Sequence, residues 1–402
     1  MSENQRTNAN TNDFGVFRIL ALGAAVCIAT VHFTQPFLNV IAEAFNLTKS
    51  AVGWVPTTTL CGYACGIFFL TPLGDIFSIR KLILAKLSVL ALTLLIASAL
   101  QSFPLFLFLT FIIGLCASSV QDFVPIAAHL APESRRGQMV GFVLTGMLLG
   151  SLLSRAVAGF ITDLSNWRTT FIVYGLSVAA VAVFGARFIP NLKPTSQAKP
   201  LEIYKAMFAW CKNRPQILWL STRHGLTGFC YSSFWVSLVF VMKEQPFNLS
   251  TSQVGYMAVP AVLGALLGSW FGKKADYYGP RSNTFIATLA ILVASLSMYF
   301  FRENIFQMIV YGILVVLGYQ ISLVTSQFEI LGVDPKARSQ LNAILITIQF
   351  LFFSMGSYLS VTVYNRFGAN GVALLCSVAA AISLLMAFLS PQLIQKKSLK
   401  SV

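Results

Sequence analysis

The chain has 402 residues, of which 56% are hydrophobic and only 10% are charged, and its formal net charge is +15. A soluble domain carries about 25% charged residues, so this composition excludes an ordinary soluble protein. The basic residues are scattered between apolar blocks, which argues against a nucleic-acid-binding face and favours basic loops on the inner side of a membrane. The blocks are continuously apolar over about twenty residues, as expected of helices that cross a bilayer and not of a closed barrel.

The first half of the chain contains six such blocks. Residues 1–15 are polar and lack the pattern of a cleaved signal peptide, so we expect a disordered cytoplasmic tail. Residues 16–189 are predicted to form an N-terminal six-helix bundle. The expected spans are residues 16–40, 52–73 and 82–100, a fourth from a turn at 102–104 to 130, a fifth at 139–161 and a sixth that ends near 189.

The second half repeats this plan after a polar break. Residues 190–215 contain several prolines and basic residues and are predicted to be a cytoplasmic linker, in which 201–211 favours an amphipathic helix on the membrane surface. Residues 216–389 are predicted to form a C-terminal six-helix bundle, and 390–402 a basic cytoplasmic tail. The expected spans are residues 216–242, 253–271, 282–301, 305–326, 341–364 and 371–389.

Loop charge predicts the orientation of the twelve spans. Most lysines and arginines fall at the termini and in alternate loops, and the other loops carry few. The basic loops hold Arg80 and Lys81, Arg135 and Arg136, the linker, Lys273, Lys274 and Arg281, and Lys336 and Arg338. By the positive-inside rule these loops and both termini are cytoplasmic, and we expect the chain to lie in a bacterial inner membrane.

Three stretches of the first half recur in the second half, each about 200 residues later in the chain. Residues 45–54 match 247–256, the charged hinge at 74–81 matches 272–281, and 132–135 match 335–338. The two halves are therefore predicted to be parallel structural repeats. Repeats packed about an axis along the membrane normal are typical of transporters, which place the substrate site near mid-membrane between them.

The repeated hinge resembles the cytoplasmic signature of the major facilitator superfamily, Gly-x-x-x-Asp-Arg-x-Gly-Arg-Arg. The matching residues are Gly74, Asp75, Arg80 and Lys81 in the first copy, and Gly272, Asp276, Gly279 and Arg281 in the second. The resemblance implies an all-α, twelve-helix fold of two pseudo-symmetric bundles. It also implies that Asp75 caps the start of span eleven, near Ser339 and Gln340, when the inner face is closed, and that Asp276 does the same near Gln138.

The fifth span is similar to the glycine-rich segment of proton-driven exporters. It keeps Gly141, Gly146, Gly150 and Gly159, and the stretch to residue 171 resembles bacterial sugar and drug efflux permeases. Many proton-coupled exporters carry an arginine early in span four, where this chain has Thr110.

Seven polar residues inside the spans are candidates to line a cavity or to couple protons. They are His32, Gln35, Asp122, Arg155, Arg223, His224 and Gln349. Intramembrane ionisable residues are functional candidates by default. Asp122 either takes up a proton or is a structural acid paired with a neighbouring helix. Arg155 either binds an anionic group of a substrate or braces the bundle, and the histidines either couple protons or pack through hydrogen bonds.

Other function classes find no support in the sequence. There is no phosphate-binding loop, no hydrolytic constellation, and no further ligand beside Cys61 and Cys65, so we expect neither an enzyme nor a cofactor or metal. The leading hypothesis is a secondary transporter for proton-coupled export of a small organic molecule. Import of a metabolite or siderophore and a non-transporting receptor or regulator are the alternatives. The expected partners are membrane lipid, a small-molecule substrate and protons, with a functional monomer and no nucleic acid.

Overall fold

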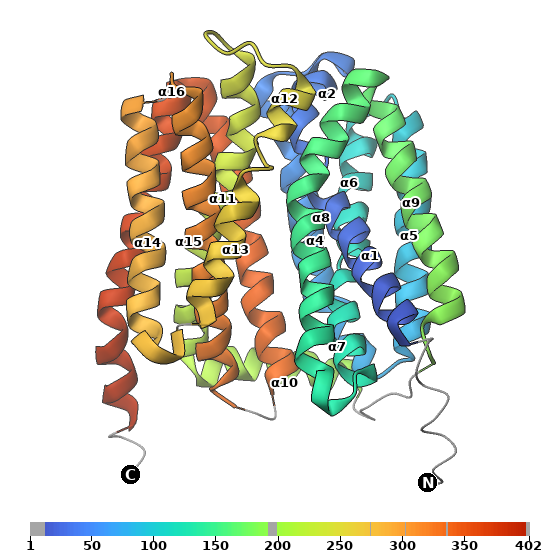
Figure 1. The fold of residues 1–402 in the computed structure, drawn as a ribbon, viewed down its shortest axis with the longest axis vertical. Helices are drawn as coiled ribbons and strands as arrows, with labels where there is room; N and C mark the ends of the chain where they lie inside the picture. The colour runs from blue at the N-terminus through green and yellow to red at the C-terminus, as the bar shows by residue number, and fades with distance from the viewer. Residues whose placement is uncertain (1–12, 192–198, 274, 302, 335–336, 399–402) are drawn as a thin grey trace.

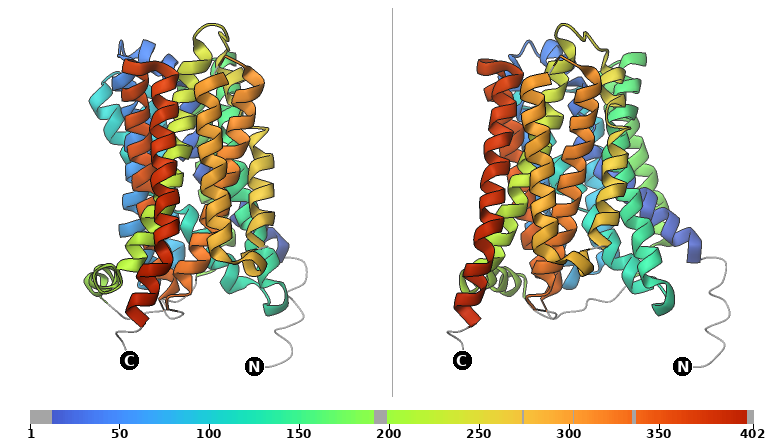
Figure 2. Two further views of the ribbon diagram at one scale, coloured as in Figure 1. Left: turned by 90° about the vertical axis from the view of Figure 1, so that its left-hand side faces the viewer. Right: turned by 60° about the vertical axis from the view of Figure 1, so that its left-hand side comes forward.

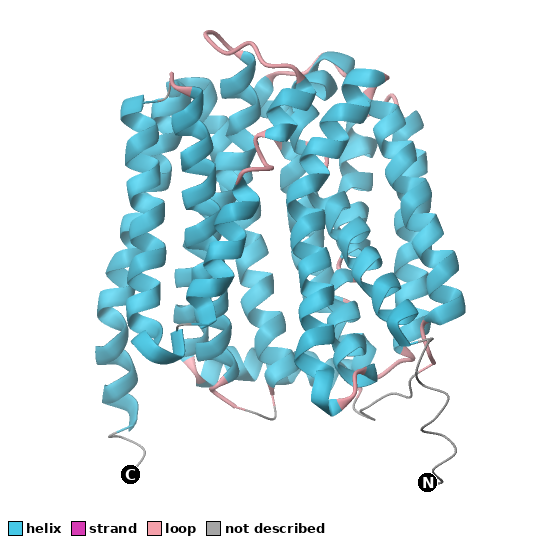
Figure 3. Cartoon of the chain, viewed as in Figure 1, coloured by secondary structure: helices cyan, strands magenta, loops and turns pink. Residues whose placement is uncertain are grey.

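The structure is a computed structural model that describes residues 13–191, 199–273, 275–301, 303–334 and 337–398. At residues 13–14, 269, 271–273, 275–278, 301 and 390–398 the description covers the backbone alone. Within these ranges every regular element is a helix and no strand occurs (Figure 3). Most of the predicted N-terminal tail lies outside the described residues.

The N-terminal half consists of helices that run up and down one bundle. They are α1 (Asp13–His32), η2 (Gln35–Phe37), α2 (Leu38–Ala44), α3 (Lys49–Val52), α4 (Trp54–Phe69), η3 (Thr71–Asp75), α5 (Ile79–Ala99), α6 (Phe103–Ala117), α7 (Val120–Leu130), η4 (Glu133–Arg135), α8 (Arg136–Leu164) and α9 (Trp167–Phe188). Two spans of this half that were predicted to be continuous helices are broken. The first breaks between α1 and η2, where Pro36 cannot continue the helix ladder, and the fourth breaks between α6 and α7.

The C-terminal half repeats the arrangement. Its helices are α10 (Pro200–Asn213), α11 (Pro215–Lys243), α12 (Thr251–Tyr256), α13 (Ala261–Lys273), α14 (Ala275–Phe301), α15 (Ile305–Leu331) and α16 (Arg338–Ser398). Eleven described segments are long and apolar enough to cross a membrane. The last of them, Arg338–Leu389, has 52 residues and turns back at Gly368, whose φ of 63° only glycine adopts easily, so it crosses twice. The predicted twelve-helix fold is confirmed.

The two halves form two bundles that lie side by side (Figure 1). Both described ends of the chain lie at one end of the molecule, which we call the terminal end, and the connections that carry α2 and α12 lie at the opposite end, the far end. Helix α10 lies across the terminal end at a steep angle to the spans (Figure 2). It buries Ile203 and Met207 and exposes Leu201 and Phe208, as an amphipathic surface helix does.

Glycines let α4 and α6 pack backbone to backbone. A Cβ atom placed on Gly114 would lie 1.9 Å from the carbonyl oxygen of Thr59, and one placed on Gly62 would lie 2.1 Å from that of Phe111. Small residues at such crossings allow the close van der Waals packing that joins helices in lipid. Any larger residue must push the two helices apart.

We predict that Gly114→Ala lowers the free energy of unfolding by about 1–3 kcal/mol, because the added methyl group forces backbone displacement in a packed core. Thermal unfolding of the purified protein in detergent measures the loss. Gly141→Ala in α8 is the matched control, since nothing lies within 4 Å of its added Cβ and alanine favours helix. Equal stability of the two variants would contradict this account of the α4–α6 crossing.

Candidate functional site

The break in the first span places two polar side chains in the middle of the molecule. α1 ends at His32, and Gln35 begins η2, so the chain turns irregular about two-thirds of the way along the 30-residue span Gly15–Ala44. Both side chains are buried. Irregular backbone at membrane depth is tolerated where it is enclosed by protein or lines a cavity, and in transporters it marks binding sites.

Arg155 of α8 binds this break and also reaches the other half of the molecule. Its Nε donates to Gln35 Oε1 at 2.8 Å, and its Nη1 donates to the Ser151 carbonyl oxygen at 2.5 Å. Its guanidinium carbon lies 4.6 Å from the ring centroid of Trp235 and 6.0 Å from that of Tyr231, both in α11. Arg155 is 2% exposed, so a full positive charge lies at the interface between the bundles.

Three buried polar atoms around this guanidinium have no hydrogen-bond partner among the described residues. They are Arg155 Nη2, His32 Nδ1 and Trp235 Nε1. His32 lies close enough to Arg155 for the guanidinium charge to act on it, and Trp235 stacks against that same group. A buried polar group without a partner costs about 1–3 kcal/mol. The cluster therefore keeps unmet hydrogen-bonding capacity between the two bundles.

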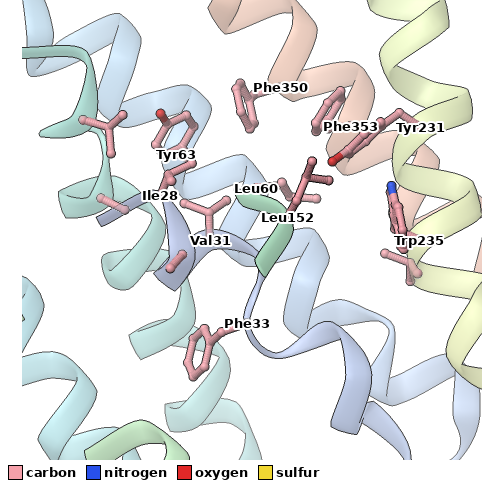
Figure 4. Close-up of a cluster of buried hydrophobic side chains, with 14 of the residues drawn as sticks. Ile28, Val31, Phe33, Leu60, Tyr63, Leu152, Tyr231, Trp235, Phe350 and Phe353 are labelled. Carbon is pink, nitrogen blue, oxygen red and sulfur yellow. The ribbon is translucent and has the colours of Figure 1, made fainter. Parts of the chain in front are cut away.

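Aromatic side chains form the rest of this central interface (Figure 4). Tyr63 of α4 lies 4.4 Å, centroid to centroid, from Phe350 of α16, and Phe350 lies 4.9 Å from Phe353. Tyr231 stacks on Phe353 at 5.3 Å, and its hydroxyl points towards Leu152 of α8. The polar cluster thus adjoins a wall of rings that comes from both halves.

His224 and Gln349 come together in the C-terminal half, but in a closed network. His224 Nε2 lies 2.9 Å from Gln349 Oε1, and its Nδ1 lies 2.9 Å from the Ser322 hydroxyl. Gln349 in turn donates to the Tyr319 hydroxyl at 2.7 Å. A neutral ring that donates from Nε2 and accepts at Nδ1 satisfies every contact. This geometry favours the packing interpretation of His224.

The other buried charges are neutralised in pairs. Lys86 Nζ of α5 lies 2.7 Å from Asp122 Oδ2 of α7, with both side chains at most 3% exposed. In the C-terminal bundle, Arg223 of α11 pairs with Glu329 of α15. The sequence interpretation singled out Asp122 and Arg223 but missed Lys86 as a partner. A lysine inside the predicted span 82–100 was the available signal, because an intramembrane lysine requires a counter-charge.

The first copy of the hinge lies at the terminal end. Asp75 ends η3, which packs against the start of α5 and against α16, and its side chain is partly buried. Arg80 donates to the Ala186 carbonyl within the same bundle, and Lys81 is exposed. A Cβ atom added to Gly74 would meet its neighbours only at ordinary van der Waals distances. The predicted capping of span eleven by Asp75 stays a prediction.

The second copy is described only in part. Gly272 and Asp276 fall where the structure gives the backbone alone, so the predicted contact of Asp276 lies outside the described side chains. Gly279 has a φ of 78° and breaks α14 at its start, a conformation that favours glycine. Arg281 is exposed.

At the far end a polar cluster, which we call the far latch, joins the two halves. Lys49 Nζ lies 2.5 Å from Glu244 Oε1, and Tyr364 donates to Glu244 Oε2 at 2.7 Å. Asn365 donates to the Ser50 hydroxyl. The sequence did not predict this cluster, because Lys49 and Glu244 are nearly 200 residues apart and each looks like a solvated loop residue.

The far latch keeps its charges at neutral pH. Burial raises the pKa of the Glu244 carboxyl, but the hydrogen bonds from Lys49 and Tyr364 and the Lys49 charge outweigh it, so this pKa lies below its usual value. Because the pKa of Glu244 is lowered in the folded protein, its ionised carboxylate stabilises the fold at pH values above the usual glutamate pKa. This stabilisation is lost only as the pH falls through the lowered pKa. The latch is therefore unsuited to sense pH near neutrality.

Further contacts close the far end, whereas a groove lies nearer the terminal end. Asp163 Oδ2 accepts from the Ser252 backbone at 2.7 Å, and Thr57 of α4 bonds Ser357 of α16 at 3.1 Å. Farther along the same two helices a largely apolar groove of about 360 Å³ lies between α4, α10 and α16. The halves therefore meet most closely in their far part.

Comparison with known proteins identifies the fold and its family. The family model of the Major Facilitator Superfamily matches residues 20–328. A putative uncharacterized transporter of Escherichia coli K12, YgaY, is 31% identical over 369 residues, which cover 92% of this chain and 93% of the relative.

Two solved structures show the same architecture. A bacterial homologue of the human lysosomal transporter Spinster, in an inward-facing and unoccupied conformation, superposes with a TM-score of 0.77 at 14% identity, over 96% of this chain and 98% of the other. The xylose transporter XylE of E. coli, in a partially occluded inward-open conformation, gives 0.69 at 15% identity, over 94% and 98%. The chain is a membrane transporter of the major facilitator superfamily.

Proposed function

We propose that this transporter exports a small organic molecule from the bacterial cytoplasm in exchange for protons, and that it does so by alternating access. The observation that carries the proposal is the far latch, which holds the two bundles together at one end beyond a polar cluster at mid-depth. Breaking the latch and closing the terminal end would move that cluster from one side of the membrane to the other. The terminal end carries the basic loops, which supports its assignment to the cytoplasm.

The Lys86–Asp122 pair is the proposed proton-coupling group. The two residues lie in different helices of the N-terminal bundle, and α7, which carries Asp122, begins at the break in span four. Protonation of Asp122 removes the attraction and leaves Lys86 with an unbalanced charge in a medium of low dielectric constant. The protonated and deprotonated pairs therefore favour different packing of α5 against α7, which couples proton binding to the conformation of the bundle.

We predict that a disulfide across the far latch stops transport. In a variant with Ser50→Cys and Asn365→Cys, oxidation joins the two bundles where these side chains now share a hydrogen bond. Substrate flux in proteoliposomes should fall to the level of empty vesicles and should return after reduction, since alternation requires the far end to open. The single-cysteine variants, oxidised in the same way, are the controls. Undiminished flux through a fully cross-linked protein would overturn alternating access at this latch.

We predict that Asp122→Asn abolishes proton-driven flux and lowers the free energy of unfolding by about 3–5 kcal/mol, because it strands the buried charge of Lys86. The double variant Asp122→Leu with Lys86→Met should recover most of the stability and none of the coupling. Flux driven by an imposed pH gradient in inside-out vesicles measures coupling and direction together.

Glu329→Gln is the matched control for this experiment, since it removes the partly buried acid that pairs with the buried Arg223. It should cost stability and leave flux dependent on the pH gradient. Proton-driven flux that survives in the double variant, or that is lost equally in Glu329→Gln, would contradict the assignment of coupling to Lys86 and Asp122.

A further inference from the structure

Charge balance distinguishes Arg155 from the other buried cations of the described spans. Three lysine or arginine side chains are buried there: Lys86, Arg155 and Arg223. Lys86 has Asp122 and Arg223 has Glu329 as counter-charge. No ion pair is found for Arg155 among the described residues, although it is 2% exposed.

The contacts of Arg155 are all to neutral groups. Gln35 supplies an amide oxygen, Ser151 a carbonyl oxygen, and Trp235 the face of its ring. These contacts stabilise a cation without cancelling its charge, and Nη2 has no partner. A buried charge without a counter-charge is strongly unfavourable, so an arginine in this environment has its lowest free energy when an anionic oxygen lies beside Nη2.

Two further buried donors without a partner lie near this guanidinium. His32 Nδ1 is buried without a partner and donates in the tautomer that carries its proton there, and the Trp235 indole nitrogen is a donor in every state. Arg155 and His32 come from the N-terminal bundle and Trp235 from the C-terminal bundle. An anion held by these groups would therefore contact both halves of the molecule.

We propose that Arg155 binds the anionic group of the transported molecule, so that the substrate class is small organic monoanions with an apolar body. The inference rests on the proposed transport function, since the cluster lies between the two moving bundles. One guanidinium balances one negative charge. The rings of Tyr63, Tyr231, Phe350 and Phe353, which pack on one another, supply an apolar surface for the rest of the molecule. Organic cations are repelled by the same uncompensated charge.

Binding to the purified protein in detergent tests the substrate class. The probes are benzoate, 2-naphthoate and hexanoate, each compared with its amide and with the amine of the same carbon skeleton, and the readout is the shift of the thermal unfolding temperature with probe concentration. At least one carboxylate should stabilise the wild-type protein, and its amide and amine should not. Arg155→Gln should weaken the binding of that carboxylate by about tenfold to hundredfold, because a charge-assisted hydrogen bond is lost.

Two further variants keep the test independent of folding. Arg155→Lys retains the charge and should keep part of the carboxylate selectivity. Arg168→Gln is the matched control: Arg168 also lies over a tryptophan ring, at 4.4 Å from Trp167, but it bonds the carbonyl oxygens of Ser98 and Leu100 away from this cluster. It should bind carboxylates as the wild type does.

The outcomes separate this inference from the transport proposal. Arg155-dependent carboxylate binding without flux in proteoliposomes would uphold the ligand class and overturn transport. Proton-driven flux of a neutral or cationic compound that is unchanged in Arg155→Gln would uphold transport and overturn the ligand class. If no carboxylate of the panel stabilises the wild type above its amide, Arg155 only braces the two bundles and the proposal is wrong.

Discussion

A positive charge within a bilayer must be balanced, and this constraint accounts for the arrangement of polar residues in the transporter. Lys86 and Arg223 are balanced inside their own bundles by Asp122 and Glu329. Arg155 is held at the boundary between the bundles by neutral partners alone. Charges that are neutralised within a bundle move with it as a unit, whereas a charge at the boundary responds to whatever lies between the halves. The distribution of counter-charges thus separates the proposed coupling pair from the proposed substrate-binding group.

The two halves have the same fold, but the polar residues that they carry differ. At the offset that aligns the two copies of the hinge, about 200 residues, the carboxylate of Asp122 and the guanidinium of Arg155 have no charged equivalents. The far latch is likewise built from unlike partners, Lys49 on one side and Glu244 on the other. Parallel repeats supply two bundles that can rock against each other. The differences between them place the proposed coupling pair in one bundle and the proposed ligand cluster at their shared boundary.

The sequence was sufficient for the fold because spanning helices obey strong local rules. Twenty apolar residues in a row, basic loops and a repeated hinge predict twelve spans in two bundles, and these are what the structure contains. The break of the first span at Gln35 was not predicted, although Pro36 carries the signal for it. A proline inside an apolar block is common enough in membrane helices that it does not decide between a kink and a break.

The site could be predicted only as a set of residue types. Seven polar intramembrane positions were recognised, but which of them meet depends on the rotation and depth of each helix, which no local pattern fixes. Arg155 meets Gln35, and His224 meets Gln349, across more than 100 residues of chain. Lys86 was overlooked although it lies inside a predicted span, and the far latch was overlooked because exposed loop charges usually have no partner.

The most direct test of the account is the distance across the far end while the transporter works. Spin labels at Ala44 and Gln245, which are exposed on opposite halves beside the far latch, report that distance in lipid nanodiscs. The account predicts one short distance in the state described here and a second, longer distance that becomes populated as pH and substrate are varied. A single short distance under every condition that sustains transport would contradict it.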